Sequence, residues 1–419
     1  MIGAANIALS ATGASTVPGS DRTLTFGGDP SITIPPGALV VSDPVELEVP
    51  DRGDLAVSIF VPENTGPATW HFQGRQTSFI SPPGDFTASA VMPVSSTTQA
   101  RFWLAGVDVT ASEHTGVIVA IGESITDGAQ STVDANARWT DQLARRLLAQ
   151  PGHRAMGVLN EGLAGNRLLH DSLGPNALAR FDRDVLAQTG VTHVIVQAGA
   201  NDIFTLNPVE EVTVEQVIQG HRQLIERAHS KGLRIFGCTL TPVEGFLLPG
   251  TPFPVFTPEK EVKRQAVNAW IRTSGEYDGV IDFDRVLRDP TSPTKIRALY
   301  DSGDHGHPND LGYNALANAI DLKLFRNDQG QHRGPAKDIA RFSSVGAPVD
   351  VARAHACRVN RGNHRAGGTW TRSSPCVDVG QGPSGLQWTR YTASESCRRS
   401  HRRRTEVVGR AAEAAGLTG

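Results

Sequence analysis

The chain has 419 residues and a mass of 44.7 kDa, which exceeds a typical single domain and allows more than one sizeable core. Its 39% apolar and 20% charged residues are ordinary for a globular protein, and no apolar run is long enough to span a membrane, so no membrane partner is expected. The formal net charge of -3 is unevenly distributed. Residues 1–330 carry 25 Lys and Arg against 37 Asp and Glu, whereas residues 331–419 carry 15 Lys and Arg against 6 Asp and Glu. The acidic character of the larger part argues against nucleic-acid binding.

The N-terminal run Met1–Ser10 has neither the basic start nor the continuous apolar centre of a signal peptide. This leaves two alternatives for the location of the protein. Either it remains inside the cell, or the sequence begins after a targeting segment.

Residues 1–112 are predicted to form an all-β domain, a small sandwich or jelly roll, because short alternating runs recur between Pro, Gly and Asp. The predicted strands are Thr23–Phe26, Ser31–Ile34, Val45–Val49, Leu55–Val61 and Ala100–Leu104.

Residues 113–326 change to a rhythm of strand and helix, which predicts a parallel sheet with helices on both faces, an α/β/α sandwich. The predicted strands are Val117–Ile121, Met156–Leu159, His193–Gln197, Arg234–Leu240 and Gly279–Phe283. The predicted helices are Ala137–Ala149, Pro175–Ala187, Thr213–Ser230, Pro258–Ser274 and Asn309–Phe325. Cys238 stands alone in its strand and is expected to be buried and inert.

Residues 327–419 form a tail that is rich in Arg, Gly and Ser and has weak periodicity, so it is predicted to be poorly ordered; a basic interaction arm is the alternative. Its cysteines and two nearby histidines follow no zinc-binding spacing, and no metal or cofactor is predicted. These residues are Cys357, Cys376, Cys397, His355 and His364.

Four short polar segments follow strand-like runs or precede the last helix, and parallel strands bring such segments to one edge of a sheet. They are Gly122–Gly128, Asn160–Asn166, Gly199–Asp202 and Asp304–Pro308. Together they supply a serine, a small backbone donor, an amide side chain and a carboxylate–histidine pair. This is the set of groups that acyl transfer through a serine nucleophile requires.

Ser124 is the predicted nucleophile, and serine needs a base within hydrogen-bonding reach. His307 is the predicted base, since Asp304 lies three residues earlier and can accept from the other imidazole nitrogen. His305 is a competitor by proximity but lacks this spacing. The alternative is that Asp304 and His307 only order a loop, with Pro308 as the first residue of the helix.

The negative charge of a tetrahedral intermediate needs fixed donors, an oxyanion hole. The backbone N–H of Gly165 can approach closely because glycine has no Cβ. The Asn201 side chain supplies an amide donor, and the N–H of Ser124 supplies a third. The alternative for Asn201 alone is a plain turn residue.

These segments resemble the SGNH (GDSL-type) hydrolase family, which is named after its Ser, Gly, Asn and His. Ser124, Gly165, Asn201 and the Asp304–His307 pair match the family pattern in order, over about residues 116–325. The β region before them resembles the first domain of a two-domain bacterial branch. The resemblance implies a three-layer α/β/α fold, flavodoxin-like in type, and hydrolysis of carboxylic esters by members that are often secreted.

One position departs from the family pattern, because Glu123 stands where Asp is usual. Its additional methylene group predicts a shifted loop, weakened catalysis, and a gain in kcat for Glu123→Asp. The alternative is that the surrounding structure accommodates Glu123, which predicts no gain. The substrate class includes short-chain acyl, aryl and acetylated-carbohydrate esters, so the expected partner is a small-molecule or carbohydrate ester. Trp70, His71 and Trp103 could line a carbohydrate cleft, although core packing is the preferred interpretation for each.

Two other functions are compatible with parts of the sequence. A carbohydrate-binding protein with a degenerate hydrolase domain would explain Glu123, and a nucleic-acid or membrane-surface binder would use the basic tail. The complete set of predicted catalytic residues favours a serine esterase without metal over both.

Overall fold

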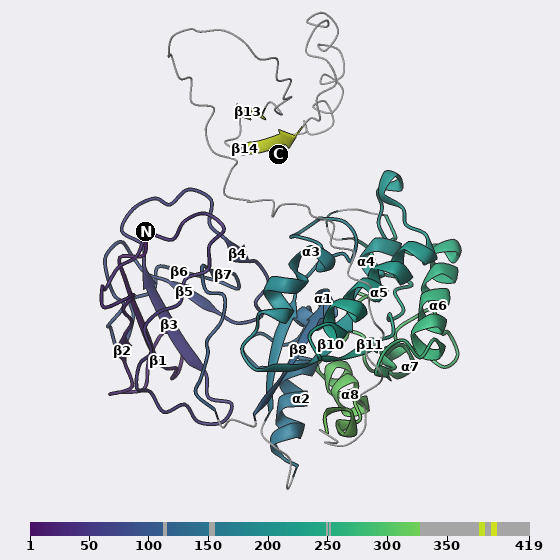
Figure 1. Ribbon diagram of the computed structural model, residues 1–419, viewed down its shortest axis with the longest axis horizontal. Coiled ribbons are helices and arrows are strands. Elements are labelled where there is room, and N and C mark those ends of the chain that lie inside the picture. The colour runs from purple at the N-terminus through teal and green to yellow at the C-terminus, as the bar shows by residue number, and fades with distance from the viewer. Residues whose placement is uncertain are drawn as a thin grey trace, which may run out of the picture. The chain divides into compact units, whose positions relative to one another are not determined.

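The computed structural model describes residues 1–111, 115–150, 156–248, 250, 253–326, 377–381 and 387–391 (Figure 1). The chain divides into two units, Met1–Gln331 and His332–Gly419. In the second unit, β13 (Val377–Gln381) and β14 (Gln387–Tyr391) pair antiparallel, which the sequence patterns do not predict. The predicted disorder of the tail otherwise lies outside the described residues, as do its cysteines and histidines.

The part of the chain before Gly116 is all-β, as predicted, and its strands form small antiparallel sheets. The central strand β1 (Ala4–Leu9) pairs with β2 (Arg22–Thr23) and β3 (Leu55–Phe60). Two further pairs join β4 (Trp70–His71) to β7 (Arg101–Phe102) and β5 (Ser78–Ile80) to β6 (Ser96–Thr98). The expected domain boundary near residue 112 falls inside the first unit and stays a prediction.

The N-terminal strands differ from the predicted ones at several places, and the short strands β4, β5 and β6 match no predicted strand. β1 was missed, because the buried polar side chain of Asn6 interrupts its apolar pattern; that side chain donates to Asp21 Oδ2 at 2.7 Å. Ser31–Ile34 is reduced to a single bridge of Ile32 to Ile2. The prediction of a strand at Val45–Val49 is wrong: its side chains alternate in exposure, but its backbone pairs with no other strand.

The strands of the second part form the predicted parallel sheet, in the order β12-β11-β10-β8-β9. Their bounds are Gly116–Gly122 for β8, Met156–Gly162 for β9, Val191–Gln197 for β10, Arg234–Cys238 for β11 and Gly279–Ile281 for β12. The chain leaves β8 toward β9 on one side and then returns to β10 on the other. The sheet therefore has its topological switch point between β8 and β10, where open α/β sheets bind their ligands.

Helices cover both faces of this sheet and give three layers. The alternation within β8 shows the two faces, because Ile118 and Ala120 join one apolar core and Val119 and Ile121 join the other. The first core is closed by α2 (Trp139–Leu148), α7 (Phe283–Leu287) and α8 (Asp310–Ala319). The second is closed by α3 (Ala177–Phe181), α5 (Val214–His229) and α6 (Pro258–Thr273). The predicted α/β/α fold is confirmed, and Cys238 is buried as expected.

The helices that the sequence patterns miss are short. α1 (Ser124–Asp127) and α4 (Ala200–Ile203) begin just after β8 and β10, and they are too short to show a helical period. α3 continues as a π-helix, Asp182–Leu186, and two 3₁₀ turns occupy Pro208–Glu210 and Leu322–Phe325. No helix in the described part of the chain is long and apolar enough to cross a bilayer.

Candidate active site

The site lies at the carboxyl ends of β8 and β10, beside the switch point of the sheet. Ser124 is the first residue of α1, and Asn201 lies in α4. Gly128 closes α1 in the left-handed conformation, with φ of 96°, which glycine tolerates. Adjacent parallel strands therefore bring these two side chains, 77 positions apart, to neighbouring turns.

Three of the predicted residues form one hydrogen-bonded relay. His307 Nε2 lies 2.8 Å from Ser124 Oγ, and His307 Nδ1 lies 2.7 Å from Asp304 Oδ2. This arrangement leaves one imidazole nitrogen to interact with the hydroxyl while the other faces a carboxylate. It can remove a proton from Ser124 and stabilise the imidazolium that results.

The Asp304 carboxylate is fixed by donors from its own loop. Its Oδ1 accepts from the backbone N–H groups of Gly306 and His307, both at 2.9 Å, and from Ser302 Oγ at 3.0 Å. Burial raises the pKa of Asp304, but the hydrogen bond and charge of His307 and these N–H donors outweigh burial and hold it well below its usual range. The carboxylate is therefore ionised at neutral pH.

His305 is separated from this relay. Its Nδ1 lies 2.6 Å from Asp301 Oδ2, its side chain is 56% exposed, and its backbone is left-handed with φ of 64°. The chain thus holds two neighbouring His–Asp pairs. Of the two, the structure brings only His307 to Ser124.

Two contacts around the relay were not predicted. Gln130 Nε2 donates to Asp304 Oδ2 at 3.2 Å, and the Phe246 ring packs edge-on against His307 with centroids 5.3 Å apart. Neither lies in the four polar segments, so the sequence offered no signal for them. Pro308 also differs from expectation, because Asn309 caps α8 and the helix begins at Asp310.

Gly165 has a local reason to be glycine. Its φ is 74°, and a Cβ built on it would lie 2.6 Å from Leu173 Cδ1, so both the backbone and the packing disfavour a side chain. Asn201 Nδ2 donates to the carbonyl oxygen of Asn166 at 2.8 Å. This bond uses one of the two amide hydrogens and orients the other.

Glu123 is buried and connects the turn of Ser124 to the turn of Asn201. Its Oε1 accepts from the backbone N–H groups of Gly199 at 2.6 Å and Asn201 at 3.3 Å. Burial, together with the charge of Asp202, raises the pKa of Glu123 to about 8, so the carboxyl is largely protonated at neutral pH. The longer side chain reaches these donors while Ser124 stays within hydrogen-bonding distance of His307, which favours the alternative that the surrounding structure accommodates Glu123.

This geometry reverses the expectation for Glu123→Asp. The shorter side chain should lose contact with the Gly199 and Asn201 N–H groups, and kcat for a short acyl ester should fall by roughly 10-fold or more, since misplacement by about 1 Å can cost about 10²-fold. Glu123→Gln is the matched control, because it keeps the length and an acceptor oxygen without charge. A kcat for Glu123→Asp at or above that of the parent would contradict this account.

The aromatic residues near the N-terminal strands are not core residues. Trp70 is 59% exposed and Trp103 is 38% exposed, so the preferred interpretation of core packing is wrong for both. Trp70 stacks on Phe102 at an interplanar angle of 8°. His71 instead contacts α1, where its Nε2 lies 2.8 Å from Asp127 Oδ1.

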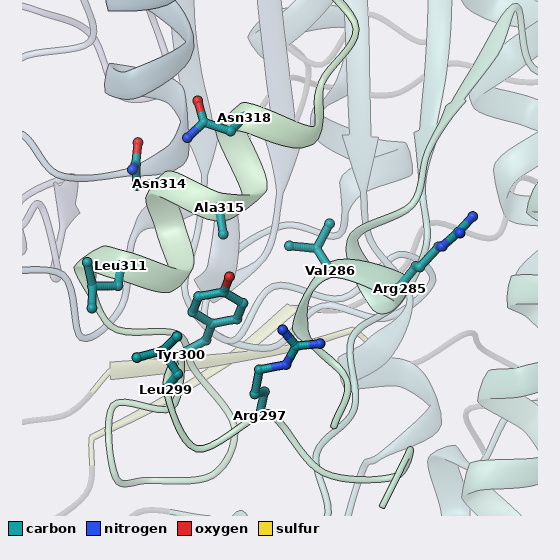
Figure 2. Close-up of a pocket in the computed structure, with 9 residues that line it drawn as sticks. All are labelled: Arg285, Val286, Arg297, Leu299, Tyr300, Leu311, Asn314, Ala315 and Asn318. Carbon is teal, nitrogen blue, oxygen red and sulfur yellow. The ribbon is translucent and has the colours of Figure 1, made fainter. Parts of the chain in front are cut away.

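An open surface pocket of about 630 Å³ lies beside α7 and α8 (Figure 2). Its lining residues are Arg285, Val286, Arg297, Leu299, Tyr300, Leu311, Asn314, Ala315 and Asn318. None of the predicted site residues is among them, so this pocket is distinct from the relay. Within the described residues, no group of three or more His, Cys, Asp or Glu side chains is arranged to hold a metal ion.

Comparison with known proteins matches residues 120–315 to the GDSL-like lipase/acylhydrolase family. Similar solved structures include a putative G-D-S-L family lipolytic protein from Desulfitobacterium hafniense, at 21% identity and TM-score 0.37, over 48% of this chain and 96% of that one. A putative arylesterase from Agrobacterium tumefaciens (20%, TM-score 0.39) and the carbohydrate acetylesterase Est24 from Sinorhizobium meliloti (16%, TM-score 0.39) each match over 50% of this chain and 98% of theirs. No curated protein matches the chain.

Proposed function

Because residues 120–315 match the GDSL-like lipase/acylhydrolase family, we propose that this chain is a serine esterase that hydrolyses carboxylic esters through an acyl-enzyme intermediate. The observation that carries the proposal is the continuous relay of Ser124, His307 and Asp304, with separations of 2.8 and 2.7 Å. Ser124 is the proposed nucleophile, His307 the general base and Asp304 the carboxylate that orients it.

In the first half of the proposed reaction, Ser124 Oγ attacks the ester carbonyl carbon and its proton passes to His307 Nε2. The tetrahedral intermediate then collapses, the carbon–oxygen bond to the alcohol breaks, and His307 returns the proton to the departing alcohol. In the second half, water attacks the acyl-enzyme by the same route and releases the carboxylic acid. The ionised Asp304 stabilises the imidazolium in each half.

The proposed oxyanion hole consists of the N–H groups of Ser124 and Gly165 and the free amide hydrogen of Asn201. Two features support it: the Asn201 amide is held by the Asn166 carbonyl, and the Ser124 and Asn201 turns are joined through Glu123. Donors fixed before the reaction need no reorganisation, and each is typically worth about 10²–10³-fold in rate.

The proposed substrates are short-chain acyl, aryl or acetylated-carbohydrate esters. The sequence lacks the long apolar runs of a lid, which disfavours long-chain lipids, and the exposed indole of Trp70 offers a flat apolar surface to an aromatic or sugar ring. The alternative of a carbohydrate-binding protein with a degenerate site finds no support, because the relay is complete.

The experiment that tests the proposal is a series of p-nitrophenyl esters of increasing acyl length, measured for the unaltered protein and for Ser124→Ala. We expect hydrolysis to be fastest for the shortest acyl chains. A protein that hydrolyses no member of the series would contradict the proposed function.

A further inference from the structure

Resting on the proposed function, we propose that His71, from the N-terminal β region, is a positioning residue for the oxyanion hole. It would act through Asp127, whose carboxylate joins His71 on one side to the backbone beside Gly165 on the other. The N-terminal β region would then contribute to catalysis by helping to position the proposed oxyanion hole.

The contacts form a chain of two hydrogen bonds. His71 Nε2 lies 2.8 Å from Asp127 Oδ1, and Asp127 Oδ2 accepts from the backbone N–H of Ala164 at 2.9 Å. Ala164 immediately precedes Gly165, the proposed backbone donor. A rotation of the Asp127 carboxylate would therefore shift the Leu163–Ala164 peptide group, which is adjacent to the peptide group that carries the Gly165 N–H.

Asp127 also lies close to the nucleophile, because it is the last residue of α1, which Ser124 begins. The helix packs tightly on the end of β9, since a Cβ built on Gly162 would lie 2.1 Å from the Asp127 nitrogen. Asp127 thus sits between the turn of Ser124 and the loop of Gly165. Fixing its side chain fixes the spacing between two parts of the proposed site.

His71 provides one of the two hydrogen bonds described for the Asp127 carboxylate. The residue is only 4% exposed, so loss of the imidazole would leave Oδ1 buried without the partner that the structure gives it, while Oδ2 keeps the Ala164 N–H. To find a new partner for Oδ1, the carboxylate is then expected to turn toward water or other donors and to release the Ala164 N–H.

Neighbours of His71 hold its segment in place independently. Thr77 bonds Asp134 through its backbone N–H and its hydroxyl, each at 2.6 Å, and Gln76 Nε2 donates to Asn136 Oδ1 at 2.9 Å. Arg75 also donates to the carbonyl of Ser131. These bonds fix the loop between α1 and α2, so a substitution at His71 should leave the fold intact.

The test measures kcat and KM on p-nitrophenyl acetate, with thermal unfolding, for His71→Ala and His71→Gln. We expect His71→Ala to lower kcat by roughly 10- to 100-fold, as misplaced catalytic groups do, with KM and the unfolding midpoint nearly unchanged. His71→Gln keeps an N–H donor near the position of Nε2 and should recover most of kcat. If the alanine variant does not fold, His71→Leu, which keeps bulk but no donor, decides instead.

The matched control is His229→Ala. His229 Nε2 lies 3.0 Å from Asp278 Oδ2, which accepts from the backbone N–H of Ile235 at 2.7 Å, so this is a similar His–Asp–backbone chain outside the proposed site. Its loss should leave kcat unchanged. In an Asp127→Asn background, His71→Ala should lower kcat much less than it does in the parent, because each substitution alone already breaks the hydrogen-bonded chain from His71 through Asp127 to Ala164.

The rate of labelling of Ser124 by a fluorophosphonate separates the two proposals, since labelling needs the nucleophile and oxyanion hole but not ester turnover. A parent protein that neither hydrolyses esters nor becomes labelled would overturn the proposed function, and the role of His71 with it. An active parent with an equally active His71→Ala variant would overturn the role of His71 alone. The same conclusion would follow if His71→Gln failed to recover kcat, or if His229→Ala lost as much activity.

Discussion

Replacement of Ser124 by alanine is expected to abolish ester hydrolysis, with kcat falling by about 10⁴-fold or more, because no other group in the relay can form the acyl-enzyme. The fold should survive. The substitution removes one oxygen atom at the start of a short helix, and the hydrogen bond that is lost joins Ser124 to His307 on a partly exposed surface.

The measurement is the p-nitrophenyl ester series for both proteins, with thermal unfolding recorded in parallel. An unchanged unfolding midpoint assigns the loss to chemistry. Turnover by Ser124→Ala comparable to that of the parent would remove Ser124 from the mechanism.

The second large effect is expected for His307→Ala, which should also lower kcat by about 10³-fold or more, since the residues of such a relay act as a unit. His305→Ala is a closely matched control, because it removes a histidine that also hydrogen-bonds an aspartate, Asp301, at 2.6 Å. We expect it to change kcat by less than about threefold, in the range of ordinary surface substitutions.

The comparison of these two variants distinguishes a base from a loop-ordering residue. If both histidines only stabilised the loop, the two substitutions should lower activity and stability together. If His305→Ala caused the larger loss in kcat, the base would be His305, and Asp304 would have lost its proposed partner.

The α/β part of the fold could be predicted from the sequence because its signals are strong and local. The strands β8, β10 and β11 each contain a run of buried residues that are mostly apolar, and the long helices α5 and α6 carry capping residues, Thr213 and Thr257, at their starts. The polar segments after the strands then predicted which residues would meet at the switch point, and the structure brings Ser124, Asp304 and His307 together.

The features that could not be predicted from the sequence depend on contacts between residues that are far apart in the chain. Val45–Val49 has the alternation of a strand, but nothing in its sequence says that no partner strand is available. The expected displacement of the Glu123 loop rests on side-chain length alone, because the N–H partners of Glu123, at Gly199 and Asn201, lie 76 or more positions away in the sequence. His71 pairs with Asp127 from another part of the chain, and no spacing rule links the two.

The most direct test of the central claim is a mass measurement on the parent protein after reaction with an excess of a fluorophosphonate, followed by peptide mapping. In that reaction Ser124 Oγ forms a bond to phosphorus, fluoride leaves, and the serine proton is removed through His307. The account predicts one phosphonyl group per chain, located on Ser124. A protein that hydrolyses esters yet gains no adduct, or carries it on another residue, would contradict it.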